Sequence, residues 1–64
     1  MSLNELRPAL IQARRAARAE HRKYFINTER LPWGGVYVHV SPFQPMAGRF
    51  VEVSPLGSIA WKGL

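Results

Sequence analysis

Apolar residues in the first part of the chain recur at alternating steps of three and four, the spacing of one side of an α-helix. Glu20 interrupts the stripe. Alanine, a good helix former, fills most of the stripe beyond its first turns and lets another element approach closely. The pattern predicts one basic amphipathic helix over residues 1–26. The positions of the stripe are Leu3, Leu6, Leu10, Ala13, Ala17 and Tyr24.

The apolar side of this helix has two interpretations. It can pack on a sheet that the rest of the chain forms, or it can form the helix-to-helix seam of a dimer, in the manner of a short coiled coil. Both interpretations are compatible if the helix uses different faces for the two contacts.

The hydrophobic period changes to two after a polar stretch at 27–30 and a Pro- and Gly-containing segment at 31–35. Strict alternation of apolar and polar residues is typical of strands that bury one side. The pattern therefore predicts strands at 36–40 and 50–53. The valines at 36, 38 and 40 lie on one side with Tyr37 and His39 on the other, and Val51 and Val53 alternate with Phe50 and Glu52.

A short internal echo supports these strands. Residues 37–43 and 50–56 share the order aromatic, valine, polar, valine, serine, proline, apolar. Proline cannot donate to a ladder and holds its predecessor extended, so both strands end at the same place. The segment 54–57 suits a type I turn, with proline second and glycine fourth. A third strand at 58–62 would continue a meander, with Ile59 and Trp61 on one face.

Together these elements predict an α+β fold in one domain, residues 1–64, with the helix at 1–26 and a β-hairpin or meander of two or three antiparallel strands at 33–62. The residues expected in the core or at a dimer seam share apolar character and the two periods described above. They are Leu6, Leu10, Ala13, Ala17, Tyr24, Val38, Val40, Val51 and Val53.

The short length of the chain favours self-association. A chain of 64 residues buries only about 60% of its unfolded surface, so its stability is marginal. Small domains compensate with disulfides, a structural metal or oligomerisation. The chain has no cysteine, and its two histidines, His21 and His39, have no aspartate to complete a zinc site. We therefore expect a homodimer with neither metal nor cofactor.

Charge adds a candidate binding surface. The formal net charge is +5, and seven of the nine cations are arginine, the residue suited to forked pairing with carboxylate or phosphate. Like charges at such helical spacing destabilise a helix by about 0.2–0.5 kcal/mol per pair. The cluster is therefore either a solvated helix face or a docking ridge for an anionic partner. Its members are Arg14, Arg18 and Arg22 at steps of four, with Arg15 and Lys23 on the neighbouring ridge.

Aromatic residues supply a second candidate surface. A small sheet with one helix leaves one face uncovered. Trp33, Tyr37, His39 and Phe50 are expected there, the first three as partner contacts, since Tyr and Trp are common interface anchors. Phe43 lies in the Pro-rich connection 42–48, either as an anchor under the loop or as a partner contact. A twofold mate covering the same face is the alternative.

Catalytic motifs are missing from the sequence. Gly34 and Gly35 form an isolated pair without the helix and lysine of a phosphate loop, and the four glutamates are scattered. We therefore expect no enzyme and no catalytic residues. No apolar run approaches the roughly 20 residues of a membrane span, so we expect a soluble protein. The absence of cysteine fits the reducing cytoplasm, where we expect the protein to act.

With a basic Ala/Arg helix at Ser2 to Tyr24 and a compact hairpin at Trp33 to Trp61, the chain resembles the short accessory proteins of temperate bacteriophages in size, charge and layout. Some of those proteins bind and disable host proteins. The resemblance implies a homodimeric inhibitor that occupies a surface of a host protein bearing an acidic or apolar patch. It has no diagnostic motif, so it transfers no functional residue. The alternatives are a basic DNA-binding regulator and a structural subunit of a larger particle.

Overall fold

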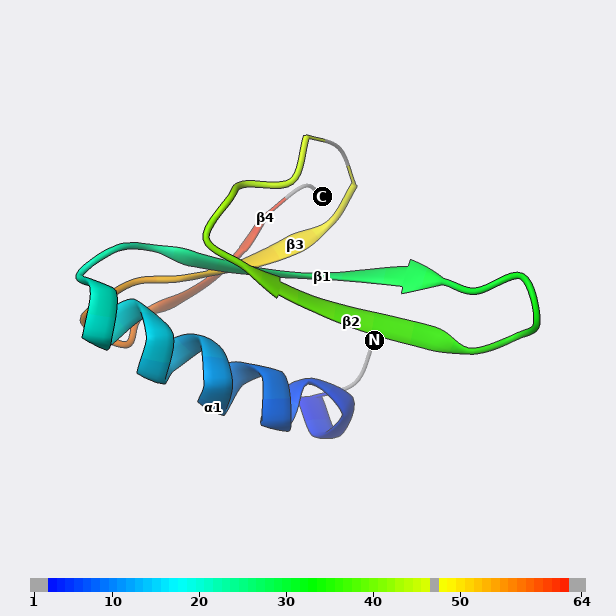
Figure 1. Ribbon diagram of the computed structural model, residues 1–64, viewed down its shortest axis with the longest axis horizontal. Coiled ribbons are helices and arrows are strands. Elements are labelled where there is room, and N and C mark those ends of the chain that lie inside the picture. Colours follow the sequence, from blue (N-terminus) through cyan, green and yellow to red (C-terminus); the bar gives the residue numbers. More distant parts are fainter. Residues whose placement is uncertain (1–2, 47, 63–64) are drawn as a thin grey trace.

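The computed structural model describes residues 3–46 and 48–62, with side chains from Leu6 onward. It shows one helix followed by four antiparallel strands in a single open sheet (Figure 1), so the predicted α+β class is confirmed. The elements are α1 (Leu3–Glu20), β1 (Tyr24–Arg30), β2 (Val36–Ser41), β3 (Phe50–Val53) and β4 (Ile59–Lys62).

The helix ends at Glu20, and its predicted extension to residue 26 was wrong. His21 takes a left-handed conformation with φ of 54°, and the Arg22 N–H donates to the Ala17 carbonyl at 3.2 Å. This 6→1 bond is the Schellman closure of a helix C-terminus. Three consecutive buried residues follow at 24–26. A helix cannot bury three neighbours against one sheet, whereas a central strand buries both of its sides.

These buried residues begin β1, a strand that the hydrophobic pattern missed because its second half, Asn27 to Arg30, is polar. β1 pairs with β2 on one side and with β3 on the other, which gives the order β2-β1-β3-β4. The sheet thus has four strands rather than two or three. It is not a simple meander, because β2 and β3 lie on opposite sides of β1. The strand expected at 58–62 is present as β4.

Two hairpins are closed by the same five-residue turn. In the first, Leu31 N–H donates to Gly35 O at 2.8 Å and Gly34 N–H to Leu31 O at 3.0 Å. The turn at 54–58 has the equivalent bonds at 2.9 and 3.0 Å, which confirms the turn predicted there. The fourth residue of each turn is a glycine with φ of 98° or 92°, a conformation that costs glycine little. Segment 31–35, expected only to break the helix–strand pattern, is therefore a hairpin turn.

The core lies between α1 and one face of the sheet. Figure 1 shows the helix below the strands and the β2–β3 connection above them. Every residue predicted for the core or seam belongs to the buried cluster or packs against it, so the apolar side of α1 covers the chain's own sheet. The cluster comprises Leu6, Ala9, Ala13, Ala17, Tyr24, Ile26, Val51 and Val53, with Leu10, Ala16, Val38 and Val40 packed around it.

The opposite face of the sheet has a small aromatic centre. Phe25 and Phe50 are buried there, with ring centroids 5.8 Å apart in an edge-to-face arrangement. The connection from β2 to β3 crosses this side of the sheet (Figure 1). Arg22 holds it, because its guanidinium donates to the Pro42 carbonyl at 3.3 Å and lies 5.7 Å from the centroid of the Phe43 ring. Such a cation–π contact stabilises by about 0.5–1 kcal/mol at an exposed site.

Candidate functional site

A groove runs between α1 and the β3–β4 turn. The helix lies against β1, β2 and β3, whereas, within the described residues, no Cα atom of α1 comes within 8 Å of a Cα atom of β4. The space left beside it is a cavity of about 220 Å³ that is open to solvent. We call it the arginine groove. Its lining residues are Ile11, Arg14, Arg15, Arg18, Pro55 and Gly57.

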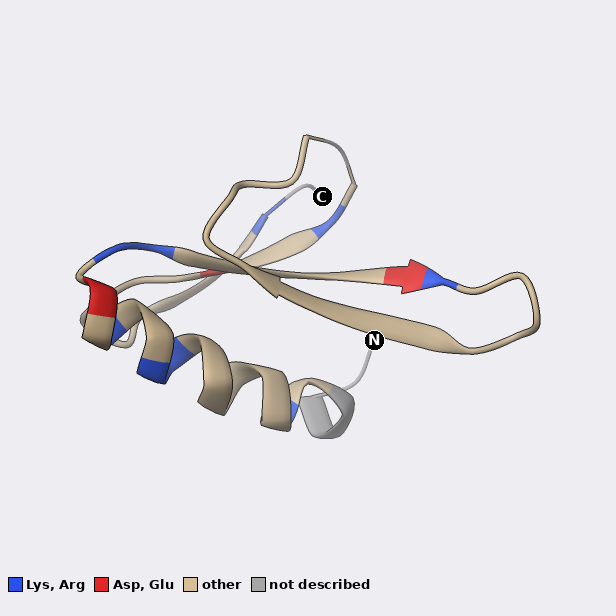
Figure 2. Cartoon of the chain, in the orientation of Figure 1, with Lys and Arg blue, Asp and Glu red and all other residues tan. Residues whose placement is uncertain are grey.

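Helical spacing brings the helix wall of this groove together. Ile11 is followed by arginines three, four and seven residues later, and positions at these intervals share one helix face. All three arginines are exposed, and no described carboxylate lies within 4.0 Å of any of them. Figure 2 shows basic residues along α1 and, within the coloured part of the helix from Leu6 onward, acidic colour only in the last turn. The groove therefore concentrates the positive charge of three arginines, and no described carboxylate neutralises it.

Glu20, the carboxylate in that last turn, is already engaged. It accepts a hydrogen bond from the Tyr24 hydroxyl, which belongs to the first residue of β1. This bond raises the pKa of Tyr24 above its ordinary value of 10.0, and desolvation of the hydroxyl adds to the effect. Glu20 thus ties the end of the helix to the sheet.

Two apolar residues of β4 follow the β3–β4 turn that lines the arginine groove. Ile59 and Trp61 of β4 are paired across the strands with Val53 and Val51, which are fully buried beneath α1. Directly paired residues point to the same face of a sheet, so both side chains lie on the helix side. They are 36% and 48% exposed, and no described Cα atom of α1 lies within 8 Å of β4. We call these two residues the β4 ledge.

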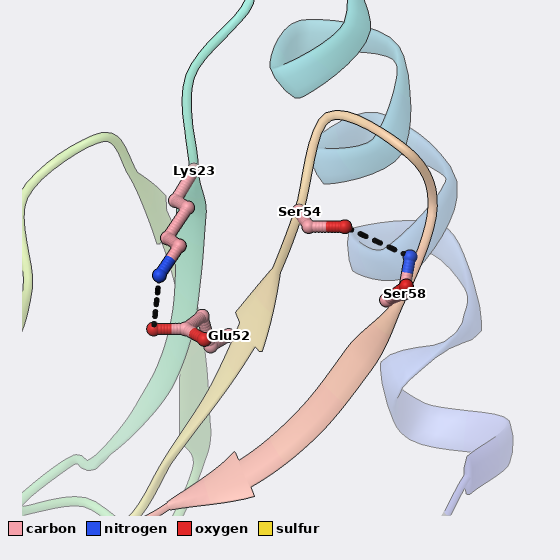
Figure 3. Close-up of polar contacts among 4 residues, drawn as sticks. All are labelled: Lys23, Glu52, Ser54 and Ser58. Carbon is pink, nitrogen blue, oxygen red and sulfur yellow. Dashed lines mark hydrogen bonds and ion pairs between the residues drawn. The ribbon is translucent and has the colours of Figure 1, made fainter.

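The predicted ridge of five cations is divided between two sides of the molecule. Arg14, Arg15 and Arg18 line the groove, but Arg22 lies beyond the end of α1 and its guanidinium turns to the β2–β3 connection. The Lys23 ammonium pairs with the Glu52 carboxylate at 3.7 Å (Figure 3), on the face opposite the helix. A continuous ridge was expected because the helix was expected to continue to residue 26.

Figure 3 also shows how the second wall of the groove is held. The Ser54 hydroxyl accepts a hydrogen bond from the Ser58 N–H at 3.0 Å, across the turn that joins β3 to β4. Together with the two backbone bonds of this turn, it fixes Pro55 and Gly57 beside the arginines. The proline has a fixed φ, so this wall is stiff.

The predicted aromatic contacts fall at three separate places. Trp33 is 80% exposed at the tip of the β1–β2 hairpin, and Phe43 is 73% exposed on the β2–β3 connection. Tyr37 and His39 lie on β2, with ring centroids 4.5 Å apart. Sequence patterns had grouped Trp33, Tyr37 and His39 on one face and Phe43 on the connection after it, whereas only Tyr37 and His39 are neighbours.

His39 has a partner that the sequence did not indicate. Its Nε2 lies 3.0 Å from Oε2 of Glu29, a residue of β1 that pairs directly with Tyr37. Finding this contact requires the β1–β2 register, and β1 was not predicted. The Ser41 hydroxyl accepts a hydrogen bond from the Phe43 N–H at 3.0 Å. The described residues bring no third His, Asp, Glu or Cys to His39 and Glu29 to complete a metal site.

Ile11, Pro55 and Gly57 were not predicted as site residues, although the spacing of Ile11 to the arginines carried a usable signal. Among the described residues, no helix is both long and apolar enough to cross a membrane. Comparison of the chain with protein-family models, with curated proteins and with solved structures finds no match.

Proposed function

We propose that this chain is a non-enzymatic homodimeric binding protein that regulates or inhibits another protein by holding an acidic segment of it in the arginine groove. The observation that carries this proposal is a row of three arginines beside Ile11, none of which has a described carboxylate within 4.0 Å. Guanidinium groups bind carboxylates in a forked geometry. The apolar residues next to them favour a partner that presents carboxylates and apolar side chains together.

The dimensions of the groove favour a protein segment over nucleic acid. Arg14 and Arg18 are one helical turn apart, about 6 Å along the axis at about 1.5 Å per residue. Such a row meets few phosphates, whereas specific DNA binders contact about 6–10. The aromatic residues also lie away from the arginines, unlike the interleaved stacking platforms of single-strand binders. The net charge of +5 nevertheless supports weak DNA binding as the second candidate.

The resemblance to short accessory proteins of temperate bacteriophages supports an inhibitor of a host protein. We place its action in the cytoplasm, where a chain without cysteine is at no disadvantage. Self-association follows from the small size of the core.

A fluorescence anisotropy titration tests the groove. The probes are a fluorescein-labelled peptide of alternating Glu and Leu, the same peptide with Lys in place of Glu, and a labelled DNA duplex. Changing Arg14, Arg15 and Arg18 together to Gln should weaken Glu-peptide binding at least tenfold. The matched control changes to Gln the residues Lys23, Arg30 and Arg49, which are exposed away from the groove, and removes the same total charge.

The control triple should weaken binding less than threefold. Equal losses in both triples would show that net charge alone attracts the peptide, and the groove would not be a site. DNA binding should fall with salt at a log–log slope of about 0.9 per phosphate neutralised and vanish near physiological salt. Sequence-specific DNA binding that persists there would make the second candidate the better account.

A further inference from the structure

β4 is an open edge of the sheet. It pairs with β3, and no strand pairs with its other side in the described part of the chain. The Ser54–Ser58 bond at the turn fixes which residues of β4 bond to β3, because hydrogen-bonded and non-hydrogen-bonded pairs alternate along an antiparallel ladder. Counting from that bond, Ala60 and Lys62 direct their backbone groups to β3. Ile59 and Trp61 direct theirs to the free edge.

The side chains on the helix side of β4 are apolar and partly exposed, which favours pairing with another strand. Ile59 and Trp61 continue the row of Val53 and Val51 toward the edge of the sheet, where they are 36% and 48% exposed. Of the usual protections of an edge strand, β4 is short and has one lysine, Lys62, which pairs with Phe50 on the face away from the helix. It has no proline, bulge or inward-pointing charge.

The other edge of the sheet differs. β2 has Val38 and Val40 packed against the core beneath α1. Its opposite side carries the contacts of His39 with Tyr37 and Glu29. On the helix side, Val38 and Val40 of β2 thus pack against the core, whereas Ile59 and Trp61 of β4 remain 36% and 48% exposed. Val36, at the far end of β2, is also exposed.

We infer that a second copy of this chain pairs antiparallel with β4 across a twofold axis at Ala60, and that this pairing completes the arginine groove. In this register Ile59 lies opposite the partner's Trp61, and both side chains are on the helix side. The backbone groups of Ile59 and Trp61 in each copy then form four hydrogen bonds across the axis. A twofold axis at Trp61 or at Ile59 would instead leave only two hydrogen bonds between residues of the two β4 strands.

Pairing of β4 with β4 of a second copy produces a closed dimer and no larger assembly. The same edge is used by both, so the interface is isologous, whereas joining β4 of one copy to β2 of the next would produce open filaments. The register also keeps the two Lys62 side chains apart, because each lies opposite the partner's Ser58.

The second copy turns the groove into a trough with two basic walls. Strands lie about 4.8 Å apart, so β1 of one copy and β1 of the other would be about 24 Å apart, with both helices on the same face. Helices about 10–12 Å wide would leave roughly half of that span between them. Arginines of each helix form the walls, and both β4 ledges form the floor. The use of this trough for an acidic segment rests on the proposed function, whereas the dimer itself does not.

Cysteine cross-linking tests the register directly, because the chain has no cysteine of its own. Ala60 would form a non-hydrogen-bonded pair with its copy, at a Cα–Cα distance of about 4.5 Å, which lies within disulfide range. Under mild oxidation Ala60→Cys should become a covalent dimer at least tenfold faster than the control Leu56→Cys, although Leu56 is 92% exposed. Equal rates would overturn the proposed pairing.

Sedimentation equilibrium at tens of micromolar supplies the second measurement. The wild-type chain should have twice its 7.3 kDa mass, Trp61→Lys should be monomeric, and Val36→Lys should remain dimeric. Val36 is the matched control, an exposed apolar residue at the other edge of the sheet. A monomeric wild type, or a folded Trp61→Lys that stays dimeric, would refute the inference. If Trp61→Lys unfolds, the cross-linking result decides.

The same variants separate this inference from the proposed function. A cross-linked Ala60→Cys dimer that fails to bind the Glu–Leu peptide would support the dimer and contradict the function. Folded monomeric Trp61→Lys that binds the peptide with wild-type affinity would show that the groove works without a second copy.

Discussion

Replacing isoleucine by alanine at three positions tests the arrangement of the sheet with one chemical change. Ile26 is fully buried in β1, between Val40 and Val51 and beneath the helix. Ile59 is 36% exposed and Ile11 is 48% exposed. The substitution removes the same atoms each time, so differences in the free energy of unfolding report on the surroundings.

Burial sets the expected magnitudes. Truncating a fully buried isoleucine to alanine costs about 2–5 kcal/mol, through lost transfer energy and the cavity left behind. Ile59→Ala should cost about 1 kcal/mol because a third of its surface is already in water. Ile11→Ala should lie within about 0.5 kcal/mol of wild type, since alanine has the higher helix propensity.

Stability of a chain of this length is about 3–10 kcal/mol, at about 0.05–0.15 kcal/mol per residue. Ile26→Ala can therefore unfold much of the protein, and Ile26→Val, with an expected loss of about 0.5–1.5 kcal/mol, serves as the milder variant. Urea unfolding followed by circular dichroism at two protein concentrations measures each loss and separates it from dimer dissociation. If Ile11→Ala costs as much as Ile26→Ala, the placement of β1 at the centre of the sheet is wrong.

Two further predictions concern the turn and the helix end. Gly57→Ala should lower the free energy of unfolding by about 1 kcal/mol in urea, because the φ of Gly57 is 92°, while no atom lies within 4 Å of an added Cβ. The neighbouring substitution Leu56→Ala should have little effect. Equal losses for the two variants would show that the backbone conformation of Gly57 is not the cause. The pKa of Tyr24 is raised by its bond to Glu20, so the folded state holds this proton more tightly than the unfolded chain. The stabilisation is therefore complete below pH 10 and lost as pH rises through the raised pKa. Wild type should lose stability there relative to Tyr24→Phe, and parallel pH curves for the two would contradict this linkage.

The fold could be predicted from sequence where local rules determine structure. The valine alternation of β2 and β3 and the Pro–Gly turn at 54–57 act over a few residues, and both were correctly assigned. β1 could not be found in this way. Tyr24 continues the helical spacing from Ala17, and the residue that ends the helix is His21 rather than the glycine usual at that position.

Contacts that depend on strand order were beyond the sequence patterns. The Glu29–His39 and Lys23–Glu52 pairs require β1 to lie between β2 and β3. The arginine groove could be predicted in part, because the spacing of Ile11 and the three arginines places them on one side of the helix. Its second wall was not, since the approach of the 54–58 turn to α1 is a tertiary contact.

The arginine groove as the binding site is tested most directly by a ¹H–¹⁵N NMR titration of the wild-type protein with the Glu–Leu peptide. We expect the largest amide shift changes at Ile11–Arg18 and in the segment 55–61, with small changes at Tyr37 and His39. Changes centred on Tyr37, His39 and Phe43, with the helix unaffected, would contradict the account and place binding on the opposite face of the sheet.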